Sequence, residues 1–212
     1  MKLHPVQAVD DRVALDMPAA GVMLLVHMET IWRLESGALR IGHLQADGRI
    51  ELVGVVLPGD LVGVEYWAGE RVALQVSALV PSRLVPVDMR RISMEAVLRE
   101  ALLTARQRAK DMVSVRTGPV AERVRSLLLL LAEGSGGAAG RALPSIKECA
   151  ELVGSAPETV CRVLGHLKDL HLLAERRRGE GALDIGHLRE VRFSQGMTSS
   201  VARTRAAPLT RT

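Results

Sequence analysis

Polar side chains occupy one side of a predicted helix that begins at Pro157. Apolar residues recur behind them at helical spacing and are expected to pack inward: Val160, Val163, Leu164 and Leu167. The residues that remain on the outside are Glu158, Cys161, Arg162 and Lys168. Arginine bonds guanine O6 and N7 together and glutamate accepts from cytosine N4, and a good bidentate pair discriminates between bases by about 1 to 3 kcal/mol. This side of the helix therefore has the chemistry to read base edges in a DNA groove.

Glu158 and Arg162 also admit a plainer interpretation. They are four residues apart, which on a helix surface allows an ion pair worth only a few tenths of a kcal/mol. The two interpretations are compatible, because such a pair can orient the arginine before it meets DNA.

The segment from Ser145 to Leu173 must position these side chains, and it predicts two short helices joined by a tight turn at residues 154–156. Ser145 followed by Glu148 is a capping box at the start of the first helix. Pro157 suits the first turn of the second helix, where its missing N–H costs nothing. This is the layout of a helix-turn-helix, whose second helix lies in the DNA major groove.

Further polar residues around this segment are predicted to contact DNA phosphates, which position a protein without specifying sequence. Residues 174–185 indicate a β-hairpin wing that turns near Gly179. The predicted phosphate contacts are Ser145, Lys147, Lys168, Arg176, Arg177 and Arg178. A run of three arginines is elsewhere typical of a solvated turn, and the neighbouring helix-turn-helix favours the phosphate role.

Charge is distributed unevenly along the 212 residues. Residues 1–89 contain 7 Lys and Arg against 11 Asp and Glu, a balance of −4, whereas residues 90–212 contain 21 against 13, a balance of +8. A polyanionic partner is therefore expected for the second half of the chain only.

The acidic half, from Gly21 to Val87, reads as short apolar runs, several separated by glycine turns. Asp47-Gly48 predicts a hairpin, and Pro58-Gly59-Asp60 predicts the next turn. Many short strands at this spacing favour an antiparallel barrel or roll. A doubly wound sheet is disfavoured, because no helix of a dozen residues separates the runs.

A long helix is predicted after Ser93, its N-cap, with apolar residues in steps of four and three that form a coiled-coil seam: Leu98, Leu102, Ala105, Ala109 and Met112. We interpret the seam as a dimer interface, because helix-turn-helix proteins commonly bind two half-sites. The alternative is a single amphipathic helix that lies on its own domain. A second helix is expected at about residues 120–133, then a glycine-rich loop at 134–140.

Other classes of protein are disfavoured by composition. No apolar run reaches the roughly 18 residues of a membrane span, and the N-terminus lacks the apolar region of a signal peptide. The two cysteines, Cys149 and Cys161, form neither a disulfide framework nor a metal pattern, which fits a cytoplasmic protein. No nucleophile with a base, metal-ligand spacing or phosphate loop indicates an enzyme.

The segment ETVCRVL at 158–164, with IWRLESGALRI and LPGDLVG in the predicted roll, resembles the CRP/FNR family of bacterial transcription regulators over nearly the whole chain. The resemblance implies an α+β protein with an N-terminal antiparallel β-roll similar to cyclic-nucleotide-binding domains, a long dimerisation helix and a C-terminal winged helix-turn-helix. It implies a homodimer on palindromic double-stranded DNA, with RNA polymerase as a further candidate partner. Glu158 and Arg162 match the family's base readers. Pro157 stands where cyclic-AMP-binding members carry another base-contacting arginine, so the half-site is expected to differ from theirs. The resemblance suggests a TTGA-like half-site of the FNR type.

The departures from the family concern the sensor. Cyclic-nucleotide members carry glutamate after the glycine matched by Gly63 and serine after the arginine matched by Arg71, where this chain has Val64 and Val72. Losing the carboxylate that holds the ribose and the hydroxyl that holds the phosphate should defeat cyclic-nucleotide binding. No cysteine precedes Cys149, so an N-terminal iron-sulfur cluster is not expected.

No cofactor is predicted, and two possibilities for an effector remain: another small molecule, or haem. A candidate pocket for another effector would include Gly63, Glu65 and Arg71. Haem would need an axial ligand, for which His4, His27 and His43 are available, although a lone histidine in a roll is more typical of a surface or packed residue.

The expected organisation is therefore a sensor-like roll at 1–90, a dimerisation helix at 91–117, a winged helix-turn-helix at 118–194 and a basic tail without regular structure at 195–212. The alternative is a regulator whose DNA binding is switched by a small molecule or haem in the roll.

Overall fold

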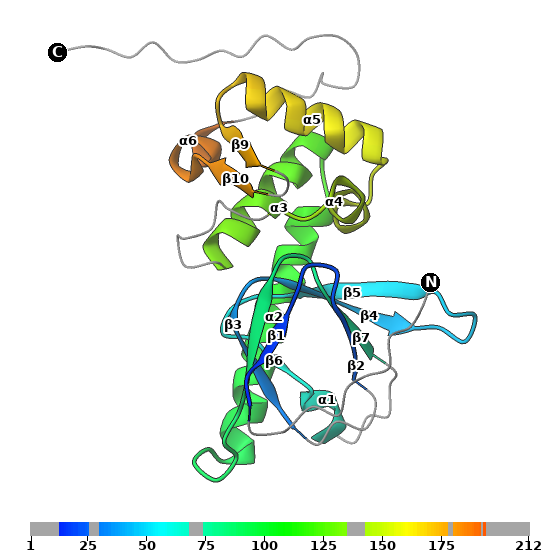
Figure 1. Cartoon of the computed structure of the whole chain (residues 1–212), viewed down its shortest axis with the longest axis vertical. Coiled ribbons are helices and arrows are strands. Elements are labelled where there is room, and N and C mark those ends of the chain that lie inside the picture. The colour runs from blue at the N-terminus through cyan, green and yellow to red at the C-terminus, as the bar shows by residue number, and fades with distance from the viewer. Residues whose placement is uncertain are drawn as a thin grey trace, which may run out of the picture.

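Antiparallel strands build the first half of the chain in the computed structural model, which describes residues 13–25, 30–67, 74–134, 143–177, 180–191 and 193. They form two four-stranded sheets with the orders β1-β8-β3-β6 and β2-β7-β4-β5. The strands are β1 (Leu15–Met17), β2 (Val22–Leu25), β3 (Trp32–Ser36), β4 (Leu39–Leu44), β5 (Ile50–Val56), β6 (Leu61–Val62), β7 (Leu74–Ala78) and β8 (Ser82–Pro86). Figure 1 shows the two sheets folded into a roll at one end of the molecule.

The core of the roll is made from the inward-facing residues of both sheets. Trp32, Leu34, Leu39, Val76 and Leu84 are all fully buried. Such burial of alternate strand residues is what makes a strand pair stable in water. Both predicted turns are present, since β4 and β5 form a hairpin closed by the Gln45 N–H to the Arg49 carbonyl at 2.8 Å, and Asp60 N–H donates to the Leu57 carbonyl at 2.9 Å.

The prediction of short strands over residues 21–87 was wrong at one place. Residues Val64–Trp67, an apolar run in the sequence, form a short helix, α1, instead of a strand. Gly63, with φ of +89°, turns the chain out of β6 directly before α1. The short strand β1 was not predicted either, and its three residues pair with β8.

The long helix α2 (Met94–Arg116) runs along the roll and continues to the C-terminal domain (Figure 1). Ser93 is its N-cap as predicted, and the Ser93 hydroxyl accepts from the Ala96 N–H at 3.2 Å. Val97 near its start and Val115 near its end are the buried residues of the helix. One face of α2 therefore packs on its own chain.

The C-terminal elements in the described part of the chain are four helices and a hairpin: α3 (Val120–Gly134), α4 (Ile146–Val153), α5 (Pro157–Asp169), β9 (Leu173–Arg177), β10 (Glu180–Leu183) and α6 (Ile185–Glu190). The core of these C-terminal elements is continuous with part of the roll. The roll residues Ala38, Leu57 and Leu79 belong to the same buried cluster as Leu127 and Leu167. The helix α6 was not predicted from the sequence. Its N-cap is Asp184, whose carboxylate accepts from the His187 N–H at 3.0 Å.

The predicted α+β architecture of antiparallel roll, long helix and winged helix-turn-helix is thus confirmed. Among the residues that the structure describes, no helix has the length and apolar character that crossing a membrane requires.

Candidate nucleic-acid interface

The helix-turn-helix consists of α4 and α5, and its first helix is capped at both ends. The predicted capping box is present, since the Ser145 N–H donates to Glu148 Oε2 at 2.8 Å and the Glu148 N–H donates to Ser145 Oγ at 3.3 Å. At the other end Gly154 adopts a left-handed conformation with φ of +62°. The Ser155 N–H then bonds the Ala150 carbonyl at 2.9 Å, which ends the helix and aims the chain into α5.

The recognition helix α5 begins at Pro157, as predicted, and has no side-chain cap. Three of the four apolar residues expected to face inward are buried, and Leu164 is half-buried. The side chains expected on the outside are exposed: Pro157, Glu158, Cys161, Arg162 and Lys168. The structure, which describes both residues, contains no ion pair between Glu158 and Arg162. Their polar groups are therefore presented to solvent.

Five of the six predicted phosphate contacts lie in or next to described helices and strands. Ser145 and Lys147 are exposed at the start of α4, and Lys168 is exposed near the end of α5. Arg176 and Arg177 belong to the wing strand β9. Arg178 and the tail beyond residue 193 lie outside the described residues.

An arginine that the sequence did not point to holds the turn between the two helices. Arg123 on α3 donates from Nη1 to the carbonyls of Val153, at 2.5 Å, and Gly154, at 3.0 Å. These are carbonyls at the C-terminal end of α4, which have no partner within the helix. Arg123 thereby ties the turn to α3. The two carbonyls are 30 and 31 residues away from it, so no local pattern could have indicated the contact.

The two cysteines differ in their environment. Cys149 is buried on the inner side of α4, and burial raises the pKa of its thiol to about 12. Cys161 is exposed on the outer side of α5. Both are helical, as expected, and Cys149 has a packing role.

The predicted seam forms a stripe along α2. Leu98 is 39% exposed and Leu102 is 70% exposed, and Ala105 and Ala109 are also exposed. Met112 is half-buried and packs against the main core of its own chain. The stripe therefore offers apolar surface from Leu98 to Ala109, whereas Met112 at its end packs within its own chain.

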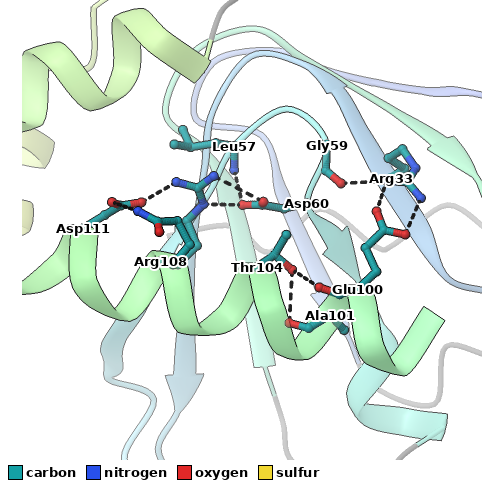
Figure 2. A network of polar contacts seen from close by, with 10 residues as sticks. Arg33, Leu57, Gly59, Asp60, Glu100, Ala101, Thr104, Arg108 and Asp111 are labelled. Carbon is teal, nitrogen blue, oxygen red and sulfur yellow. Dashed lines mark hydrogen bonds and ion pairs between the residues drawn. The ribbon is translucent and has the colours of Figure 1, made fainter. Parts of the chain in front are cut away.

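The packed face of α2 is held to the roll by two arginine contacts (Figure 2). Arg33 on β3 pairs with Glu100 and also donates to the Gly59 carbonyl at 2.8 Å. Arg108 on α2 donates from Nε to the buried carboxylate of Asp60 at 2.7 Å, and the same carboxylate accepts from the Leu57 N–H at 2.9 Å. Both contacts meet at the turn between β5 and β6. Sequence reasoning identified the turn but not its partners on α2.

The candidate effector residues in the roll are only partly described. Gly63 is buried, and a Cβ there would lie 2.9 Å from the Thr30 carbonyl oxygen, so this glycine is required by the backbone. Val64 packs with Ile31 and Val97 in an apolar cluster. Glu65 is half-buried, and its Oε2 is buried without a hydrogen-bond partner among the residues that the structure describes.

Arg71, His4 and His27 lie outside the described residues. His43 is half-buried on β4. Within the ranges that the structure describes, no cluster of three or more His, Cys, Asp or Glu could hold a metal ion.

Comparison with known proteins gives consistent matches. Residues 122–191 match the family model described as "Crp-like helix-turn-helix domain". The transcriptional regulator LdrP of Thermus thermophilus is 31% identical over 166 residues, which cover 75% of this chain and 85% of LdrP. The nitrogen fixation regulation protein FixK of Rhizobium meliloti is 34% identical over 150 residues, which cover 68% of this chain and 69% of FixK.

Solved structures agree with the fold. A CRP-family transcriptional regulator of Thermus thermophilus superposes with a TM-score of 0.64 at 26% identity, covering 83% of this chain and 95% of that one. FixK2 of Bradyrhizobium japonicum superposes with a TM-score of 0.63 at 22% identity, covering 87% and 98%.

Proposed function

Because the chain belongs to the CRP/FNR family of transcription regulators, we propose that it binds a two-fold symmetric DNA site as a homodimer and needs no cyclic nucleotide to do so. The outer face of α5 enters the major groove, where Glu158 and Arg162 read bases, with Pro157 and Cys161 beside them. A cytoplasmic location follows from this partner, and RNA polymerase is the candidate protein partner.

The outer face of α5 is the observation that carries this proposal. The helix is held in the core by the buried side chains of Val160, Val163 and Leu167. On its opposite side Glu158 and Arg162 are exposed, and the structure, which describes both, has no ion pair between them. An arginine whose donors face solvent can bond guanine O6 and N7 together. Ser145, Lys147, Lys168 and the wing arginines supply phosphate contacts that fix the register of α5 on the duplex.

Selecting bound sites from random DNA tests the proposal. The expected result is a site with two inverted half-sites centred about 34 to 36 Å apart along the duplex, one helical turn. Arg162→Ala should weaken binding to that site by about 1 to 3 kcal/mol and relax the preference at one base pair in each half-site.

Lys147→Ala is the matched control for Arg162→Ala. It should weaken binding to all sequences about equally and lower the salt dependence by roughly one phosphate contact. An unchanged base preference in Arg162→Ala would remove this residue from the readout. A wild-type protein that selects no sequence would refute the function itself.

Dimerisation is supported by the apolar stripe on α2. Leu102, 70% exposed, lies in the stripe, whereas its neighbour Leu103, 63% exposed, is displaced from it by about 100° around the helix. Large exposed apolar side chains in a row indicate an interaction surface. Leu102→Glu should shift the protein to a monomer in analytical ultracentrifugation, and Leu103→Glu should not. Equal behaviour of the two variants would contradict the seam.

Cyclic-nucleotide independence is supported by Val64, which fills with apolar packing the position where the family's nucleotide-binding members carry glutamate. A different small effector is the second candidate function, because the buried Oε2 of Glu65 has no hydrogen-bond partner within the described part of the chain. A ligand that binds the native state raises its melting temperature. Thermal-shift screening with cyclic nucleotides and other metabolites should show no shift with cyclic AMP, and a shift with any other compound would favour the effector-switched regulator.

A further inference from the structure

A polar contact joins the roll to the helix-turn-helix at Arg40. This arginine lies on β4, where its Nε donates to Ser77 Oγ at 2.7 Å, and its Nη1 pairs with the carboxylate of Glu151 on α4. The Arg40 side chain is 21% exposed and that of Glu151 is 38% exposed. The partners are 111 residues apart in the sequence. The buried side chains of Gln75 and Ser77 lie beside this pair.

We infer that Arg40 is a positioning residue for DNA recognition, which acts through Glu151 to hold the helix-turn-helix at a defined angle to the roll. The inference rests on the proposed function and extends it to a residue far from the recognition helix. Arg40 touches no base, and its effect is on the orientation of α5.

The helix α4 can transmit the contact because it is packed against α5. Leu152 and Val153 on α4 share one buried cluster with Val160 and Val163 on α5. Arg123 fastens the turn between the two helices to α3. A displacement of Glu151 therefore displaces the whole helix-turn-helix rather than one side chain.

The backbone connection leaves this angle weakly defined. Residues 117–119 join α2 to α3 and are exposed, and Gly118 has φ of +87° with open space where a Cβ would be. The apolar contacts between the roll and the C-terminal core are non-directional. An arginine already fixed by Ser77 adds a directed contact, and binding sites generally need their groups held within about 0.5 Å.

The contact is compatible with bound DNA. The recognition helix α5 lies at the end of the molecule remote from the roll (Figure 1), and Glu158 and Arg162 are exposed while the Arg40 contact is intact. Nothing in the described roll covers this face of α5. The contact therefore sets an angle and does not block the surface.

Full-length Arg40→Gln tests the inference. Fluorescence anisotropy would compare the selected site, the same site with the half-site spacing changed by one base pair, and random DNA. An ion pair of this exposure contributes modestly, so affinity for the selected site should fall about three- to tenfold over the two protomers. Affinity for random DNA should not change, and discrimination between the two spacings should shrink.

Further variants separate positioning from general stability. Arg49→Gln removes a roll arginine paired with Asp47 on the exposed β4–β5 turn and should leave every value unchanged. Ser77→Ala removes the hydroxyl that fixes Arg40 and should reduce the spacing preference less than Arg40→Gln does, because the pair with Glu151 remains. Arg40→Lys should retain part of the preference. The double variant Arg40→Glu with Glu151→Arg should recover discrimination that Arg40→Glu loses.

The outcomes are decisive in each case. Arg40→Gln behaving like Arg49→Gln, or binding the selected site more tightly, would overturn the inference. Equal losses on the selected and random DNA would also overturn it, because they indicate damage without a change of angle. Both results leave the proposed function intact, whereas a wild-type protein without sequence preference removes the proposed function first.

Discussion

The roll and the helix-turn-helix place their charged side chains in opposite ways. In the roll, Asp60 and Arg33 point at the chain itself and hold α2 through Arg108 and Glu100. On α5, the charged residues point at solvent over a buried apolar side. A charge held inside its own fold stabilises one geometry, whereas a charge presented outward is available to a partner. The roll therefore fastens α2 through partly buried charges, and the proposed DNA contact lies on the exposed charges of the helix-turn-helix.

The largest effect that sharpens this contrast is expected from Asp60→Ala. The variant removes a buried carboxylate, leaving the Arg108 guanidinium and the Leu57 N–H without their acceptor. Breaking such a buried pair from one side costs about 3 kcal/mol, which urea denaturation would measure. Asp47→Ala removes an exposed carboxylate and should cost less than about 0.5 kcal/mol. If the remaining folded Asp60→Ala protein also lost its base preference, Asp60 would act on DNA recognition as well as on stability. The contrast between the roll and the helix-turn-helix would then be wrong.

A smaller effect is expected at the two helix caps. Ser145→Ala and Ser93→Ala each remove an N-cap hydroxyl, from α4 and α2, and each should cost about 1 kcal/mol of stability. Only Ser145 belongs to the proposed DNA interface, so Ser145→Ala should also weaken DNA binding while Ser93→Ala should not. DNA affinity measured below the melting temperature separates the two contributions. If the two variants bound DNA with equal affinity, Ser145 would not be a phosphate contact.

The smallest effect concerns pH at α6. A hydrogen bond to Asp184 raises the pKa of His187, and the same bond lowers the pKa of Asp184. The His187 contribution to stability is full below its ordinary value of 6.5 and is lost as the pH rises through the raised folded value. The Asp184 contribution is full above its ordinary value of 3.8 and is lost as the pH falls through the lowered folded value.

The pair at α6 should therefore stabilise most between these limits. Both groups are exposed, so the effect on melting temperature should be slight. Proton NMR titration of His187 should give a pKa above that of the same histidine in Asp184→Asn. Identical titration of the two proteins would show that no such bond forms.

Local features were predictable because their partners are near in sequence. Four local features were predicted correctly, since each depends on residues close together in the chain. They are the Ser145–Glu148 capping box, the Ser93 cap, the Asp47-Gly48 hairpin and Pro157 at the start of α5. The alternation of buried and exposed residues on α5 followed from helical spacing in the same way. Val64–Trp67 was misjudged, because an apolar run does not distinguish a strand from a short buried helix.

The sequence alone determined the types and order of most elements, the recognition helix and the identity of its outward side chains, since these follow from spacing along a few turns of backbone. Tertiary structure decided what those elements are fastened to. Asp60 meets Arg108 across 48 residues and Arg40 meets Glu151 across 111, and no periodicity encodes such pairs. The physical reason is that a charged side chain finds its partner only after packing has fixed which surfaces adjoin, so the angle of the helix-turn-helix is a property of the folded chain.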